Sequence, residues 1–451
     1  MNDQWVRWLP STLGRRLSGR RGLQAIVANT GWLFFDTFVR LGIGFLVGVK
    51  VARYLGPGRY GTLNFASALV ALFASVASLG LNSILVRDLV RYPEKRDDLI
   101  GSAFRLKLIG GVSAFVLGQV CVFVLRPTDT VSQLLVAIIA SSLIFQAMDV
   151  VDSWLQSKVE SRFAVYARNV AVLVAAAVKV ALIIGRASLV AFAWATMVEA
   201  VVAAIGFGVV AKLRLPSRWY RSGTWPLMRG LLKESWPLMF SGIAIMLYMR
   251  IDQIMLAQMI GASEVGIYSA ALRISEIWYV IPTAIVISVA PSLTEARERS
   301  QQLYQERFEQ VVRNLAIVAY GVALLVFASG QKIVVLLYGQ SFASAGPILT
   351  VHVWAAVFVF VGVAGTPWVL NEGLTRIALY RTALGALINI LLNVVLIPKY
   401  GGLGAATATI ISQAISAWIS NLFFGPASRH LFYVQTRALS LGILKPSRWQ
   451  R

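Results

Sequence analysis

The chain has 451 residues, of which 57% are hydrophobic and 14% charged, and its 42 basic and 20 acidic residues give a formal net charge of +22. A soluble domain averages about 45–50% apolar and about 25% charged residues, so this composition excludes a soluble multidomain enzyme and predicts a membrane protein. The basic excess is expected as Lys and Arg beside membrane helices on the cytoplasmic side, and no nucleic-acid partner is predicted.

Residues 1–23 form a basic segment with five arginines, in which Trp5 and Trp8 are interleaved. The apolar run that follows, 26–49, is long enough to span a bilayer, and no small-residue cleavage site comes after it, so a signal peptide is not predicted. We expect a retained cytoplasmic segment. Its Trp side chains fit an interfacial helix at headgroup level, and a disordered basic tail is the open alternative.

Stretches of about 20 mostly apolar residues, the length that a transmembrane helix needs, follow one another along the rest of the chain. Twelve are predicted: 26–49, 60–86, 99–125, 131–153, 163–184, 188–211, 236–259, 266–290, 310–337, 347–370, 377–397 and 402–425. Two of them contain signals for a break, Ser78-Leu79-Gly80 in the second and Pro282 in the eighth.

The basic residues between these spans are distributed unequally. If the N-terminus is cytoplasmic, 26 Lys and Arg fall in the predicted cytoplasmic connections and termini and six on the opposite side. This ratio follows the positive-inside rule and predicts an even number of spans with both termini in the cytoplasm. The expected location is the inner or plasma membrane of the cell. The external connections are short, which leaves little room for an external catalytic domain.

The longest internal connection, 212–235, is basic and rich in Trp, and it is expected to be an amphipathic linker between two lobes of six helices, 24–211 and 236–426, with a basic cytoplasmic tail at 427–451. An internal repeat supports this division. A shift of 205 residues places Ala52, Gly56, Gly61 and Ala66 on Ala257, Gly261, Gly266 and Ala271, and a shift of 214 gives nine identities in thirty between 162–191 and 376–405. Parallel repeats of this kind form transporters with a cavity between two lobes.

Charged side chains inside the spans need a partner or a wet cavity, because each costs roughly 2.5–3.5 kcal/mol on insertion scales. Asp36 and Arg40 lie four residues apart on one helix face and are expected to pair, either as a structural ion pair or as a cavity-lining Arg balanced by an acid. Arg250 is expected to face the cavity, while Asp252, on another face, meets a neighbour.

Further charges in the spans have narrower interpretations. Arg273 and Glu276, three residues apart, can pair, and Arg273 is a candidate for lining the cavity. Lys179 and Glu199 either line the cavity or pair with each other. Asp149 and Asp152 are expected to be solvated at a helix end, and Gly44 and Gly48 to allow close helix packing.

No covalent chemistry is predicted. A single cysteine, Cys121, excludes an intramolecular disulfide and multi-cysteine metal motifs, and two histidines exclude a histidine-rich metal site. No motif joins a serine to a histidine, no Gly-Lys phosphate loop is present, and no metal is expected. His352 in the tenth span is a weak candidate for proton coupling.

Two sequence motifs resemble those of oligosaccharide flippases in the multidrug/oligosaccharidyl-lipid/polysaccharide exporter superfamily. The early motif, LG followed by YG, consists of Leu55, Gly56, Tyr60 and Gly61. The late motif, N-x-x-L-N-x-x-L-I-P-x-Y-G, consists of Asn389, Leu392, Asn393, Leu396, Ile397, Pro398, Tyr400 and Gly401. The resemblance covers roughly residues 24–426. Lipid II flippases of the superfamily usually have fourteen helices, and multidrug and toxin extrusion transporters lack the early motif in this form.

The resemblance implies two six-helix lobes around a V-shaped cavity that works by alternating access. It also implies a flippase that moves a polyprenyl-diphosphate-linked oligosaccharide, of the O-antigen or exopolysaccharide type, to the outer leaflet without covalent catalysis, with possible H⁺ or Na⁺ coupling. Polysaccharide polymerases and glycosyltransferases are the implied partners. The predicted cavity residues are Asp36, Arg40, Lys179, Glu199, Arg250 and Arg273, because cations match the phosphates. A cation-coupled multidrug antiporter and a membrane glycosyl polymerase are the alternatives.

Overall fold

The computed structural model describes residues 21–216 and 219–443, and these form helices and turns without a β-strand. They contain ten segments long and apolar enough to cross a membrane. Composition therefore predicted the class correctly: this is an all-α, multi-pass membrane protein.

The first group of helices comes from the N-terminal half of the chain. It comprises α2 (Arg21–Ser78), α3 (Leu81–Arg91), α4 (Arg96–Leu125), α5 (Thr130–Phe145), α6 (Val150–Ser157), α7 (Arg162–Ile184) and α8 (Leu189–Arg214). We call these seven helices the N-group.

The second group comes from the C-terminal half, which we call the C-group. It comprises α9 (Trp225–Met259), α10 (Ala262–Glu276), α11 (Val280–Arg299), α12 (Gln301–Tyr338), α13 (Ala345–His352), α14 (Ala355–Ala364), α15 (Thr366–Asn371), α16 (Thr375–Ala417) and α17 (Pro426–Leu439).

Two of the ten apolar segments turn back on themselves at a glycine. Gly56 in α2 has φ 71° and Gly401 in α16 has φ 55°, a region of backbone conformation that only glycine enters without strain. Pro57 follows Gly56 and has no N–H for a continuing helix. Dividing the two segments at these glycines gives twelve spans, and the count of twelve itself stays a prediction.

The two sequence signals for a break have different outcomes. α2 ends at Ser78, and Leu79 and Gly80 both have positive φ before α3 begins, so this break is confirmed. In the eighth span the interruption is a 3₁₀ turn at Ile277–Tyr279, which precedes Pro282. Pro282 itself lies in the first turn of α11, where its missing N–H costs little.

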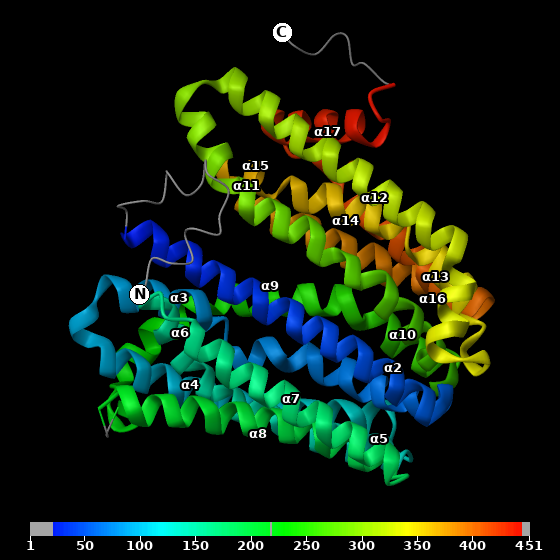
Figure 1. Ribbon diagram of the computed structural model, residues 1–451, viewed down its shortest axis with the longest axis horizontal. Coiled ribbons are helices and arrows are strands. Elements are labelled where there is room, and N and C mark those ends of the chain that lie inside the picture. Colours follow the sequence, from blue (N-terminus) through cyan, green and yellow to red (C-terminus); the bar gives the residue numbers. More distant parts are fainter. Residues whose placement is uncertain (1–20, 217–218, 444–451) are drawn as a thin grey trace.

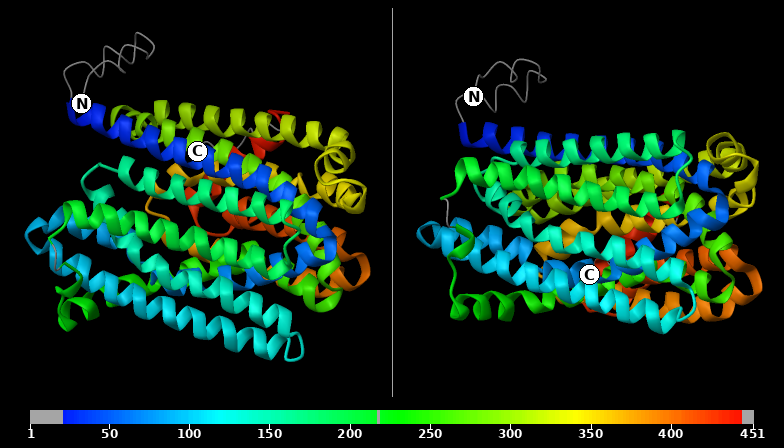
Figure 2. Two further views of the ribbon diagram at one scale, coloured as in Figure 1. Left: turned by 60° about the horizontal axis from the view of Figure 1, so that its bottom comes forward. Right: turned by 90° about the horizontal axis from the view of Figure 1, so that it is seen from below.

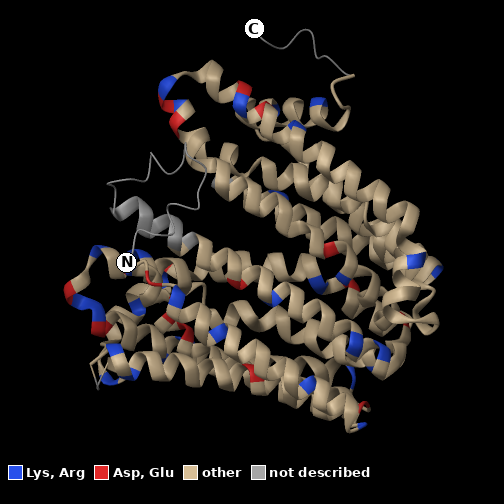
Figure 3. Cartoon of the chain, viewed as in Figure 1, with Lys and Arg blue, Asp and Glu red and all other residues tan. Residues whose placement is uncertain are grey.

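The N-group and C-group lie side by side along the length of the molecule (Figures 1 and 2). In Figure 1 they spread apart toward the left, where α2 begins and where α3–α4 and α11–α12 connect, and we call this the divergent end. They come together on the right, where α2 and α16 turn back and α9 connects to α10, and we call this the convergent end. Figure 3 shows Lys and Arg gathered at the divergent end, with acidic residues among them.

The predicted linker and tail are partly helical. α8 continues to Arg214 and α9 begins at Trp225, so 14 of the 24 residues of 212–235 belong to these two helices. α17 occupies the start of the predicted tail. Most of the predicted N-terminal segment, 1–20, and the end of the tail, 444–451, lie outside the described residues, and the lobe boundaries stay predictions.

The repeat positions meet at the convergent end. A Cβ built on Gly61 would lie 1.7 Å from the Ala262 carbonyl oxygen, and one built on Gly266 would lie 2.0 Å from that of Pro57. Gly61 and Gly266 are equivalent under the 205-residue shift, as are Pro57 and Ala262. The two halves therefore pack through matching backbone surfaces, which any larger side chain would separate.

Candidate functional site

A cavity of about 940 Å³ lies between the two groups, lined by α2, α7, α8, α9, α10, α11 and the turn before α11. All six side chains that the sequence singled out as cavity residues line it: Asp36, Arg40, Lys179, Glu199, Arg250 and Arg273. That they contact a substrate stays a prediction.

The break at Gly56 divides α2 into a first arm before it and a second arm after it. The first arm supplies much of the cavity wall, and its lining residues recur every four positions. Asp36, Arg40, Gly44 and Gly48 all line the cavity, and residues four apart lie on one face of a helix. The spacing thus predicted correctly that Asp36 and Arg40 share a face.

Their pairing was predicted wrongly. Asp36 is buried and its Oδ2 lies 3.2 Å from Nε of Arg168 in α7, whose Nη1 lies 2.8 Å from Oδ2 of Asp152. Arg168 was not singled out from the sequence, although it is a charged residue within a predicted span. Asp152 is buried as well, so its expected role as a solvated helix end is also wrong. This triad ties α2, α6 and α7 together.

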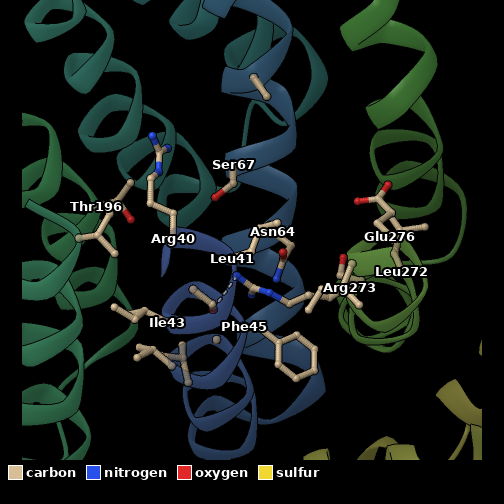
Figure 4. A pocket seen from close by; sticks show the side chains of 18 of the residues that line it. Arg40, Leu41, Ile43, Phe45, Asn64, Ser67, Thr196, Leu272, Arg273 and Glu276 are labelled. Carbon is tan, nitrogen blue, oxygen red and sulfur yellow. Dashed lines mark hydrogen bonds between the residues drawn. The ribbon is translucent and has the colours of Figure 1, made fainter. Parts of the chain in front are cut away.

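Arg40 makes no direct contact with an acid, although Asp36 and Asp149 lie near enough to interact with it electrostatically. It is exposed in the cavity, and it makes no ion pair or hydrogen bond within residues 21–216 and 219–443. Figure 4 shows its side chain directed away from Arg273. A guanidinium has five N–H donors, and all of those of Arg40 are available to a ligand.

The C-group wall carries a loose ion pair. Arg250 Nη1 lies 3.9 Å from Glu276 Oε2, near the limit of an ion pair. Asp252 is buried and accepts a hydrogen bond from Tyr268, so the prediction that Arg250 faces the cavity and Asp252 a neighbour is confirmed.

Arg273 does not pair with Glu276, contrary to expectation. Its Nη2 donates to the Gly44 carbonyl at 3.1 Å and its Nη1 to the Tyr60 hydroxyl at 3.2 Å. A Cβ on Gly48 would lie 2.3 Å from Arg273 Nη1. The prediction that Gly44 and Gly48 bring two helix backbones together is therefore wrong. The two glycines leave room for a guanidinium from the other group.

Lys179 and Glu199 fulfil both of their alternatives. They line the cavity and lie 3.7 Å apart, Lys179 Nζ to Glu199 Oε2, with side chains 25% and 34% exposed. With Glu276 included, four basic and three acidic side chains line the cavity, and Arg40 is the base that makes no hydrogen bond or ion pair with a described side chain.

Several uncharged polar residues of the wall were missed. Tyr60, Asn64 and Ser67 lie at i, i+4 and i+7 in the second arm of α2, so they form one polar face in an apolar helix (Figure 4). This periodicity was a readable signal. Gln253 and Tyr279, which also line the cavity, had no comparable one.

The late sequence motif lies away from the cavity. Asn389 and Asn393 are buried in α16, where Asn393 Nδ2 donates to Asn389 Oδ1 at 2.9 Å and Asn389 Nδ2 donates to Ser412 Oγ at 3.3 Å. Ser412 lies beyond Pro398 and the break at Gly401, so these amides join the two arms of α16. In the early motif Gly56 and Gly61 shape the convergent end, while Tyr60 lines the cavity.

His352 lies in the C-group, outside the cavity wall. It is buried, and its Nδ1 lies 2.9 Å from Ser275 Oγ, a contact that no sequence motif indicated. Its Nε2 has no hydrogen-bond partner among the described residues. His352 therefore has neither a carboxylate beside it nor access to the cavity.

Comparisons with known proteins agree with this architecture. A family described as polysaccharide biosynthesis protein matches residues 26–297, and a family described as MatE matches residues 237–395. Two Haloferax volcanii proteins are similar: "Probable flippase AglR", 32% identical over 38% of this chain and 37% of its own length, and "Probable low-salt glycan biosynthesis flippase Agl15", 25% identical over 42% and 40%. The matches thus span less than half of either relative.

Solved structures show the same fold. A multidrug resistance MATE family transporter of the MOP superfamily in an inward-facing conformation superposes with a TM-score of 0.67 at 15% identity, covering 90% of this chain and 98% of that one. The lipid II flippase MurJ in an inward closed conformation has a TM-score of 0.68 at 13% identity, covering 92% and 91%. Since the first family match spans more than half of the 451 residues, the chain belongs to the polysaccharide biosynthesis protein family.

Proposed function

We infer that this protein is a flippase, which moves a polyprenyl-diphosphate-linked oligosaccharide from the cytoplasmic to the outer leaflet by alternating access. The glycan-biosynthesis name of one matched relative and the flippase names of both support the proposal. The MOP-type fold supports a transporter without covalent catalysis. Glycosyltransferases that build the lipid-linked unit and a polymerase that uses it are the expected functional partners.

The unpaired guanidinium of Arg40 in the cavity carries this proposal. Holding an unpaired cation within a membrane protein costs free energy, and the cost is offset when an anion binds there. Phosphate oxygens match a guanidinium two at a time, and the attraction strengthens in a cavity with a lower dielectric constant than water.

The size of the cavity suits a head group rather than a whole lipid. Its volume of about 940 Å³ lies near the top of the range of roughly 300–1,000 Å³ that small-molecule sites occupy. A polyprenyl chain remains in the bilayer in this scheme, while the diphosphate and sugars enter between the N-group and C-group.

The charge distribution orients the transport cycle. The connections at the divergent end are those that hold the basic excess, so this end faces the cytoplasm in the proposed orientation and loads the substrate. Cysteine labelling on a Cys121→Ser background can test it at Trp225, whose side chain is 70% exposed. Labelling of Trp225→Cys by an impermeant maleimide from outside the cell would contradict this orientation.

A cation-coupled multidrug antiporter is the second candidate, because the MatE family matches residues 237–395. H⁺ or Na⁺ coupling is common to both proposals. They differ in what accumulates when the protein is absent: a lipid-linked glycan for a flippase, and a toxic small molecule for an antiporter.

Deletion of the gene with complementation separates the two functions. Loss of the protein should accumulate lipid-linked oligosaccharide and reduce exported polysaccharide, and Arg40→Ala should fail to restore export at a normal membrane level. Arg59→Ala is the matched control, because Arg59 lies in the same helix, is exposed, makes no hydrogen bond or ion pair with the described residues and does not line the cavity. Unchanged lipid-linked glycans in the deletion strain, with increased drug sensitivity, would replace the flippase proposal with the antiporter.

A further inference from the structure

The N-group and C-group are joined at the convergent end by an arginine from one group seated in the other. Arg273 extends from α10 across to α2 (Figure 4). There it donates to the Gly44 carbonyl and to the Tyr60 hydroxyl. Its guanidinium occupies the space that a side chain at position 48 would fill, with three of its atoms within 2.8 Å of that Cβ position. The notch formed by Gly44, Gly48 and Tyr60 thus accepts one guanidinium group.

Other contacts at this end also cross between the groups. Arg126, at the end of α4, donates through Nη2 to the Ala257 carbonyl of α9 at 2.5 Å. Gly61 and Gly266 bring the backbones of α2 and α10 together beside the notch. Because the cavity lies directly inside these contacts, it cannot open at the convergent end until they part.

The bonds of Arg273 suit a contact that forms and breaks. Both acceptors are neutral, and Arg273 forms no ion pair within the described residues, whereas Arg168 is held by two carboxylates. When Arg273 leaves, no lone charge remains in the notch. Glu276 lies three residues along α10 and lines the same cavity, so a carboxylate is near the departing guanidinium.

We propose that Arg273 is a latch that holds the convergent end of the cavity closed while its guanidinium is bound in the notch of Gly44, Gly48 and Tyr60. Release of Arg273 from the notch is a required step in opening this end. The latch acts on the conformational equilibrium, so it holds for any substrate and does not depend on the flippase function.

Gly48→Ala tests the latch while preserving every charge. The new methyl group displaces the flexible end of Arg273 and needs no backbone shift. Gly42→Ala is the matched control, because a Cβ there has nothing within 4 Å and Gly42 is outside the cavity wall. Arg273→Ala removes the latch by a second route.

Spin-label distances in lipid nanodiscs, without substrate and on a Cys121→Ser background, give the readout. Labels at Arg59→Cys and Lys399→Cys report the convergent end, and labels at Glu94→Cys and Gln301→Cys report the divergent end; all four positions are exposed. Gly48→Ala and Arg273→Ala should each raise the ratio of long to short separations at the convergent end roughly tenfold, as expected for losing a hydrogen bond to a charged group. The divergent end should close in parallel.

Gly42→Ala should match the unsubstituted protein, and Arg273→Lys, which keeps the charge without the planar fork, should fall between the extremes. Gly48→Ala and Arg273→Ala distributions equal to that of Gly42→Ala would overturn the latch. That result would leave the flippase proposal intact, because the measurement uses no substrate.

Discussion

Arg168 and Arg40 both belong to the N-group, but Arg168 has a structural role and Arg40 faces the cavity. Arg168 is held by Asp36 and Asp152, with side chains 8% and 12% exposed, and it joins three helices. Arg40, four residues from Asp36, makes no hydrogen bond or ion pair with a described side chain and faces the cavity. Spacing along the helix would pair Asp36 with Arg40, but Arg168 from another helix pairs with Asp36 instead. The Arg40 guanidinium is therefore available to a ligand.

The largest expected effect is on the triad. Arg168→Ala leaves Asp36 and Asp152 buried without their cation, and breaking a buried pair costs roughly 3–5 kcal/mol. We expect a marked fall in membrane level and in the thermal unfolding midpoint in detergent, with Arg59→Ala as the exposed control. An Arg168→Ala protein as stable as the control would show that the triad is not structural.

A smaller effect distinguishes the two possible partners of Asp36. Asp36→Ala removes one carboxylate of the ion pair and leaves Arg168 with Asp152, so the expected loss is roughly 1–3 kcal/mol, the cost of removing one partner of a buried polar group. Adding Arg40→Ala should not restore stability, because Arg40 is not the partner. Recovery of the membrane level in the Asp36→Ala, Arg40→Ala double variant would reinstate the pair predicted from spacing.

The smallest effect is expected at the Lys179–Glu199 pair, which joins α7 and α8 within the N-group. Lys179 and Glu199 are 3.7 Å apart and about a quarter to a third exposed, so Glu199→Gln should change the free energy of unfolding by less than about 1 kcal/mol. Thermal unfolding in detergent measures it against Asp36→Ala. A loss as large as that of Asp36→Ala would mean that the cavity wall is as tightly held as the triad.

The sequence predicted the elements with long-range regularity. Twenty-residue apolar runs located the spans, and four-residue spacing placed Asp36 and Arg40 on the cavity face, because both depend on helix geometry alone. The partners of Asp36 and Arg273 were not predictable in this way. They depend on how α7 and α10 pack against α2. Asp36 and Arg168, like Gly44 and Arg273, which are 229 positions apart, carry no local signal of contact.

Glycines show the same limit. Gly56 and Gly61 were recognised through a motif, and the 205-residue shift related them to Gly261 and Gly266. The sequence did not indicate that the helix backbones at Gly61 and Gly266 would pack against each other, nor that Gly48 would make room for an arginine. A glycine in the sequence can indicate close packing, but it does not indicate which backbone or side chain packs against it.

The central claim is that Arg40 is free to bind an anionic head group. Its most direct test is flipping in proteoliposomes of a fluorescent N-acetylglucosamine linked to a polyprenyl diphosphate, compared with the same sugar on a polyprenyl chain without the diphosphate. The wild-type protein should flip the charged lipid faster, and Arg40→Ala should slow it at least about tenfold, with the neutral lipid and protein stability unchanged. Equal rates for the charged lipid in wild-type and Arg40→Ala proteoliposomes would contradict the account.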